Sequence, residues 1–186
     1  RHAKHFLDWA SAANSLYKKG NENILLGLAQ FRFIWAHLES AYERMVSEHS
    51  RLPEADAWLS HFPGWCAYVL DLHVSPRRRI SVLETALNAA RRLEDKGAEG
   101  EHLGSLGNAY AALGDARKAI EFYEQHLSIA REMGDRRSEG ADLCNLGIVY
   151  ADLGDARKAI TFYEQALVID REIGDRRAEG AILGNL

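Results

Sequence analysis

The stretch GEHLGSLGNAYAALGDARKAIEFYEQHLSIAREMGDRRSE occupies residues 100–139, and GADLCNLGIVYADLGDARKAITFYEQALVIDREIGDRRAE follows at residues 140–179. The two stretches align without a gap, and 27 of their 40 positions are identical. A third copy starts at Gly180 and reads GAILGNL up to residue 186. A fixed period of this length indicates a series of equivalent supersecondary units that stack on one another.

Each unit contains two segments in which apolar residues recur at helical spacing. Gly114 and Gly134 predict the ends of the two helices, because glycine readily adopts the left-handed conformation there. Asp115 and Asp135 then predict N-caps for the next helices. The residues expected to face the core are Leu103, Leu106, Tyr110 and Leu113 in the first helix and Ala119, Ile120, Tyr123, Leu127 and Ala130 in the second.

A degenerate copy of the unit lies upstream, at residues 60–99. Residues 80–100 keep the pattern of the second helix, and Ser75-Pro76 supplies a cap and a proline in the first turn. The first helix, from Gly64, keeps small or apolar residues at Cys66, Ala67 and Leu70. The sequence therefore predicts a repeat array over residues 60–186, with units at 60–99, 100–139 and 140–179 and a truncated unit at 180–186.

The pattern Leu103-x-x-Leu106-Gly107-x-x-Tyr110, followed by Ala119 and Phe122-Tyr123, resembles the tetratricopeptide repeat. Small residues at Gly107 and Ala119 are expected to let the two helices of a hairpin approach closely. The period is longer than the usual 34 residues, as in kinesin light chain and the spindle-orientation adaptors, and Arg131 and Arg171 stand where the helix-ending proline usually lies. The resemblance implies an all-α, right-handed superhelix, or α–α solenoid, with an N-terminal helical cap.

A second resemblance concerns the kind of longer protein in which such repeats occur. The opening RHAKHFLDWA, the segment GNENILLGLAQFRFIWAHLESAYE and the near-identical GDARKAI and GDRRAEG elements are similar to the region after the ATPase in bacterial NB-ARC signalling proteins of the STAND class. The resemblance implies a cytoplasmic ligand-sensing arm that binds a protein or peptide. No ATPase motif lies in this sequence, and a freestanding adaptor or scaffold is the alternative.

Residues 1–59 lack the period of 40 and are expected to form the cap. Two helices are predicted, from His2 to about Lys18 and from Ile24 to about His49, and a third runs from Glu54 toward Phe62, near Pro63. Phe31, Trp35 and Tyr42 form an aromatic stripe at helical spacing. The stripe is interpreted as core, and a ligand pocket is the alternative.

The resemblance also implies which residues bind the partner, because the first helix of each unit lines the concave face in this family. The corresponding positions also differ between the two copies at several places, although a freely drifting solvent face would do the same. Gly104 and Cys144 replace the cations of a carboxylate clamp, so chaperone tails are not expected as partners. The candidate positions are Glu101, Gly104, Asn108, Ala111, Ala112, Ala141, Cys144, Ile148, Ala151 and Asp152.

Composition argues against other classes of function. The net charge is −4 and the pI is about 6.1, which argues against nucleic-acid binding. No apolar run is long enough to span a membrane. The two cysteines and eight histidines form no metal or catalytic motif, so no metal, cofactor or enzymatic activity is expected. Asp135-Arg136-Arg137 and its copy at 175–177 are interpreted as caps and ion pairs between units, with a basic partner-binding ridge as the alternative.

The sequence begins without Met and stops within a repeat, so it is interpreted as a fragment of a longer protein. An unfinished repeat is expected to leave apolar residues exposed at the C-terminal end. Leu153, Leu167 and Ile169 are the residues expected there, and end-to-end self-association through them is a further prediction.

Overall fold

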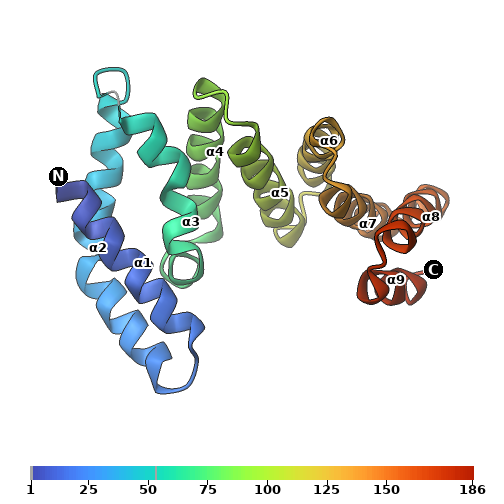
Figure 1. Cartoon of the computed structure of the whole chain (residues 1–186), viewed down its shortest axis with the longest axis horizontal. Helices are drawn as coiled ribbons and strands as arrows, with labels where there is room; N and C mark the ends of the chain where they lie inside the picture. Colours follow the sequence, from blue (N-terminus) through green and yellow to red (C-terminus); the bar gives the residue numbers. More distant parts are fainter. Residues whose placement is uncertain (1, 53) are drawn as a thin grey trace. The chain divides into compact units, whose positions relative to one another are not determined.

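The protein is all-helical over the residues that its computed structural model describes, which are 2–52 and 54–186 (Figure 1). Side chains are described in these ranges except at residues 2–7 and 66–73. No strand occurs in the described ranges, which confirms the expected all-α class. The helices are α1 (His2–Lys18), α2 (Glu22–Glu48), α3 (Ala55–His73), α4 (Pro76–Arg92), α5 (Lys96–Ala112), α6 (Ala116–Met133), α7 (Arg136–Asp152), α8 (Ala156–Ile173) and α9 (Arg176–Leu183).

The chain divides into two units, Arg1–Glu99 and Gly100–Leu186. The first unit contains α1 to α4 and the first turn of α5, and the second contains the rest of α5 and α6 to α9. The sequence-based division at residues 59 and 60 falls inside α3. Both full repeats therefore lie in the second unit.

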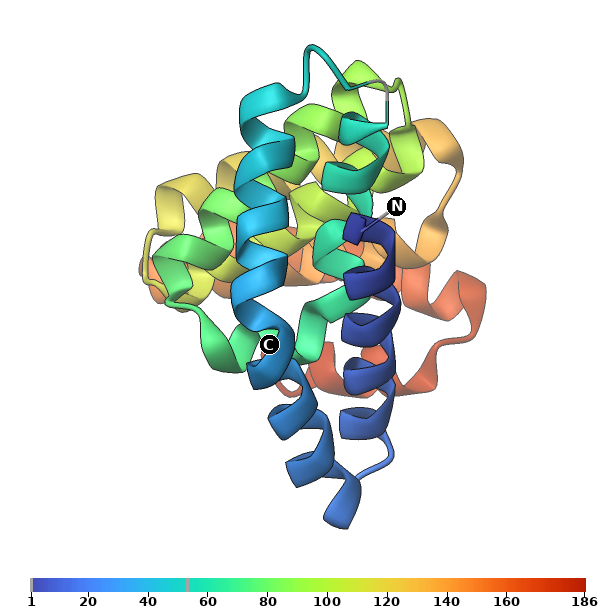
Figure 2. The same ribbon diagram turned by 90° about the vertical axis from the view of Figure 1, so that its left-hand side faces the viewer.

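In the first unit, α1 and α2 lie side by side as an antiparallel pair (Figure 2). They approach most closely at Gly27, where an added Cβ would lie only 2.7 Å from the carbonyl oxygen of Ala13. Helix α3 packs against both helices. The largest fully buried side chains of this unit come from α2 and α3 and are Phe31, Ile34, Leu38, Leu59 and Phe62.

The two helices predicted near the N-terminus are confirmed, but the expected end of the third is wrong. Helix α3 continues through Pro63 to His73. A proline inside a helix removes one backbone hydrogen bond. Burial of Trp58, Leu59 and Phe62 on the same helix opposes that loss. The expectations for Cys66, Ala67 and Leu70 concern side chains outside the described set.

The aromatic stripe of α2 belongs to the core of the first unit. Phe31 and Tyr42 are buried, and Trp35 is half-buried with its ring centroid 5.4 Å from that of Phe31. Tyr42 also packs against Phe62 of α3 at 5.2 Å. The core interpretation of this stripe is therefore confirmed.

The turns of the second unit follow the predicted stop-and-cap pattern. Gly114 and Gly134 have φ angles of 77° and 70°, which favour glycine. Asp115 Oδ1 accepts a hydrogen bond from the amide of Lys118 at 3.2 Å. Equivalent N-caps occur at Asp135, Asp155 and Asp175, and at Ser75 in the degenerate copy.

The interior of each hairpin also follows the expected pattern, with two exceptions. Leu103 and Leu106 of α5 are fully buried, as are Leu143 and Leu146 of α7. Leu113 is 46% exposed, so its expected place in the core is wrong: it lies beyond the last residue of α5, in the turn. Ile120 is only half-buried. The helices α6, α7, α8 and α9 pack in chain order, each against the next.

Candidate peptide-binding face

The ten candidate positions lie on the first helices of the two repeats, five on α5 and five on α7. None of these residues is buried, whereas the leucines on the opposite side of the same helices are. The structure thus places the candidates on one accessible surface of each helix, which is here called the groove face.

Asn108 carries the only side-chain amide among the ten groove-face positions. The neighbouring helix fixes its orientation. The hydroxyl of Tyr123 on α6 donates to Asn108 Oδ1 at 2.8 Å. Burial, together with the charge of Asp142, raises the pKa of Tyr123 to about 12, so the phenol stays protonated and remains a donor. With its oxygen occupied, Asn108 is left with its NH₂ group for a ligand acceptor.

Gly104 makes room for a histidine. A Cβ at this position would lie 2.9 Å from Nδ1 of His126, and one at Gly100 would lie 3.3 Å from Cδ2 of the same ring. The imidazole therefore packs against two consecutive turns of α5. Its Nδ1 lies 3.0 Å from Oδ1 of Asp142 on α7, so His126 joins the first hairpin to the next helix.

Asp142 is almost completely buried, and its Oδ2 has no hydrogen-bond partner among the described residues. Burial raises the pKa of Asp142, and the hydrogen bond with His126 opposes that rise. The sequence did not reveal this pair, because its histidines form no recognisable motif. The available signal was that two positions differ in chemistry between the two copies: position 102/142 is histidine or aspartate, and position 126/166 is histidine or alanine.

The second repeat replaces this arrangement. Cys144 stands at the position of Gly104, Ala166 at that of His126, and Asp170 at that of Ala130. Burial, with a smaller contribution from Asp170, raises the pKa of the Cys144 thiol, so it is poorly suited to act as a nucleophile. The groove face therefore changes chemically from one repeat to the next.

Ion pairs connect each second helix to the helix that follows it. Arg131 Nε donates to Glu139 Oε1 at 2.8 Å, and Arg136 pairs with the same carboxylate and with Glu172. Arg137 lies 3.3 Å from Asp175 of the next turn. The capping and pairing interpretation of the Asp-Arg-Arg turns is thus confirmed.

The arginine that replaces the usual proline has a role that the sequence did not reveal. Arg91, Arg131 and Arg171 each bond a glutamate eight residues ahead, at 2.8, 2.8 and 2.7 Å. Burial alone would raise the pKa of Glu139, but hydrogen bonds from Arg131 and Arg136 overcome it and hold that pKa below the ordinary value. The pair therefore bridges the turn at which the second helix ends.

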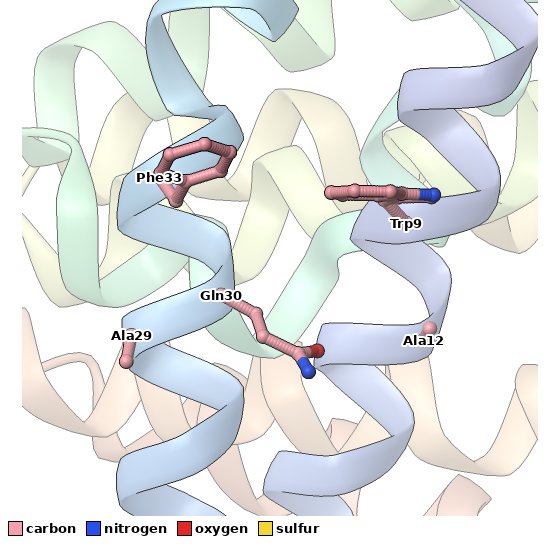
Figure 3. Close-up of a pocket in the computed structure, with 5 residues that line it drawn as sticks. All are labelled: Trp9, Ala12, Ala29, Gln30 and Phe33. Atoms are coloured by element: carbon pink, nitrogen blue, oxygen red, sulfur yellow. The ribbon is translucent and has the colours of Figure 1, made fainter.

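A separate hollow lies in the first unit, between α1 and α2 (Figure 3). Its volume is about 480 Å³, within the range of ligand pockets. Trp9 and Ala12 line it from α1, and Ala29, Gln30 and Phe33 line it from α2. Its lining is mostly apolar, and the Gln30 side chain extends from α2 toward α1.

The residues expected to promote self-association are only partly exposed. Leu153 is 56% exposed, but Leu167 and Ile169 are buried, so their expected exposure is wrong. They lie on the side of α8 that packs between its neighbours. The exposed large apolar residues of this helix are Ile160, Val168 and Ile173.

Over the residues described, no group of three metal-ligating side chains comes together. In the same ranges, no helix is both long and apolar enough to cross a bilayer.

Two repeated hairpins of this geometry define a protein built from helix–turn–helix repeats. Sequence comparison identifies the repeat: tetratricopeptide-repeat family models match residues 80–132 and 141–173. These two segments are thus tetratricopeptide repeats, a class of module that generally binds other proteins. A comparison with curated proteins finds no match.

Solved structures show the same fold at low sequence identity. A STAND protein with a tetratricopeptide repeat sensor from Pyrococcus horikoshii aligns with 98% of this chain at a TM-score of 0.70 and 18% identity. A putative kinesin light chain from Podospora anserina with nearly identical TPR-like repeats aligns with 98% at 0.64 and 16% identity. BtubC from P. vanneervenii aligns with 81% at 0.61 and 21% identity.

The chain spans only part of two of these proteins. It covers 26% of the STAND protein and 61% of BtubC, against 83% of the kinesin light chain structure. The likeness therefore shows a shared α–α solenoid fold of tetratricopeptide type.

Proposed function

We propose that this chain binds a protein or peptide segment along the groove face, as the cytoplasmic ligand-sensing arm of a STAND signalling ATPase. The groove-face residues that carry the proposal are Glu101, Gly104, Asn108, Ala111, Ala112, Ala141, Cys144, Ile148, Ala151 and Asp152. No cofactor or metal is required for this role.

The observation that supports this face most is the oriented amide of Asn108. A hydrogen bond from Tyr123 fixes its oxygen, and its NH₂ group remains for a backbone carbonyl of the partner. Around it the side chains are small, so an extended segment or a helix can lie close to the backbone of α5 and α7. The core-facing leucines of the same helices are identical in both repeats, while the groove face varies.

The test is capture of a partner by the full-length protein and by groove variants. Asn108→Ala combined with Ile148→Asp should abolish capture, because both residues are exposed on the groove face. Glu124→Ala on the exposed side of α6 is the matched control and should capture as the wild type does. Equal capture by all three proteins would exclude the groove face as the binding surface.

The sensor-arm assignment rests on likeness in fold to the Pyrococcus horikoshii protein over almost the whole chain. A freestanding adaptor is the second candidate, supported by the similar likeness to the kinesin light chain repeats. The full reading frame discriminates between them. A phosphate-binding Walker A sequence upstream supports the sensor arm, and an initiator Met close to Arg1 supports the adaptor.

A further inference from the structure

The buried carboxylate of Asp170 sets the second repeat apart from the first. Asp170 lies on α8 and is 4% exposed. Its Oδ2 is buried and has no hydrogen-bond partner among the described residues. An unpaired carboxylate in such a place is costly, and protein structures normally provide it with a partner.

The carboxylate lies against the first helix of its own hairpin. A Cβ at Gly140 on α7 would be 3.0 Å from Asp170 Oδ1, so this glycine is what leaves space for the acid. Cys144, one turn further along α7, is close enough for Asp170 to affect its thiol. Cys144 belongs to the groove face, so Asp170 lies directly behind the edge of that face.

Among the described residues, the charged groups that act on the pKa of Asp170 are both acidic. Burial raises the pKa of Asp170, and the neighbouring acids Asp175 and Glu179 raise it further. The nearby cations Arg171 and Arg176 both bond Glu179. The ionised form of Asp170 therefore lacks compensation inside the second repeat.

The first repeat supplies the comparison. There the corresponding glycine, Gly100, is covered by the ring of His126, which also bonds the buried acid Asp142. In the second repeat the position of His126 is Ala166, so the equivalent imidazole is missing. At the first junction the histidine thus bonds one oxygen of the buried carboxylate, whereas Oδ2 of both Asp142 and Asp170 lacks a partner among the described residues.

We propose that Asp170, whose carboxylate lies beside Gly140 of α7, is a subsite for a cationic group of the bound partner, either an ammonium or a guanidinium. The proposal rests on the groove-face function and deepens it, because it selects partner segments that carry a lysine or an arginine. Glu101 and Asp152 carry the only charges among the ten groove-face positions, and both are acidic, which favours the same partner chemistry.

The test uses small probes on the whole chain. N-acetyl-lysinamide and N-acetyl-argininamide are titrated while the backbone amides of Gly140 and Cys144 are followed by NMR. Saturable shifts are expected with both probes and not with N-acetyl-norleucinamide, which has the same reach without the charge. Equal shifts with the uncharged probe, or none with any probe, would overturn the proposal.

Two variants test the acid itself. Asp170→Ala introduces the residue found at the equivalent position 130, and Asp170→Asn keeps the shape without the charge. Either change should weaken binding about tenfold or more, the effect of losing one hydrogen bond to a charged group. Unchanged affinity in both variants would contradict the subsite.

A third variant places a histidine of the chain itself beside Asp170. Ala166→His together with Cys144→Gly copies the arrangement of the first repeat, in which the ring lies over a glycine. This protein should bind the cationic probes at least several-fold more weakly, because the imidazole occupies the space beside Asp170. Undiminished binding by a folded double variant would argue against the site.

The pH dependence has a definite sign. A cation binds the ionised carboxylate, and burial has raised the pKa of Asp170, so affinity should increase with pH over the range in which this group ionises. These titrations contain no peptide, so their failure would leave the Asn108 test of groove binding unaffected. Conversely, if the probes bind but no partner is captured, Asp170 is a cation site and the groove face has a role other than partner binding.

Discussion

The ring of Tyr123 occupies the place where a side chain at Gly107 would begin, since a Cβ there would lie 2.5 Å from Cε1 of the tyrosine. Gly147 and Tyr163 repeat the same relationship at the same distance. The close approach of the two helices in each hairpin therefore depends on the absence of one carbon atom.

Gly107→Ala should destabilise the protein by about 1–3 kcal/mol, the usual cost of overpacking a well-filled core. Gly147→Ala should have a similar effect, because the geometry is repeated. Gly97→Ala is the control: a Cβ there would make only an ordinary contact at 3.5 Å, and alanine favours the helix by roughly 0.5–1 kcal/mol. Urea denaturation monitored by circular dichroism measures all three changes, and equal effects at 97 and 107 would contradict the packing argument.

Gly104 and His126 should show strong energetic coupling. Gly104→Cys places a Cβ 2.9 Å from the ring nitrogen and should destabilise, and His126→Ala removes the partner of Asp142. The double variant takes the residues of the second repeat and removes the clash. We expect the double variant to lose about 1 kcal/mol less free energy of unfolding than the two single variants lose together. This difference is within the range measured for residues in contact. Additive losses in a double-mutant cycle would show that the ring and the glycine do not share this space.

The arginine–glutamate bridge across the turn should appear in the pH dependence of stability. The pKa of Glu139 is held below its ordinary value, so its contribution is present above pH 4.5 and is lost as pH falls through the folded-state pKa. Glu139→Gln should therefore make stability fall less steeply between about pH 5 and pH 3. Glu132→Gln, on an exposed residue of the preceding turn, serves as the control. An unchanged slope in Glu139→Gln would exclude the bridge as a source of acid sensitivity.

The caps provide a fourth test. Asp135 accepts hydrogen bonds from the amide and the hydroxyl of Ser138, and these bonds lower its pKa. Asp135→Ala should cost about 1 kcal/mol of stability, as for other N-cap removals. Asp135→Asn keeps a side-chain acceptor at the cap and should therefore lose less stability than Asp135→Ala. Thermal unfolding of the two variants decides the order, and a larger loss for asparagine would contradict the capping role.

The sequence predicted the local features of this protein well. Helix positions, glycine stops and aspartate caps depend on residues within a few positions of one another, and the 40-residue period displays each of them twice. Pro63 is the exception, because tertiary burial of its neighbours keeps α3 continuous where local chemistry predicts an end.

What the tertiary structure decided is which side chains meet across helices. The pairing of His126 with Asp142, the bond from Arg131 to Glu139 and the unpaired Asp170 each depend on how one helix is rotated against the next. A repeated sequence pattern predicts a repeated backbone structure. It does not predict which side chains contact the few residues that differ between the copies. Those residues were visible in the sequence as differences between copies. Only packing showed that a histidine bonds Oδ1 of Asp142, and that Oδ2 of both Asp142 and Asp170 lacks a partner among the described residues.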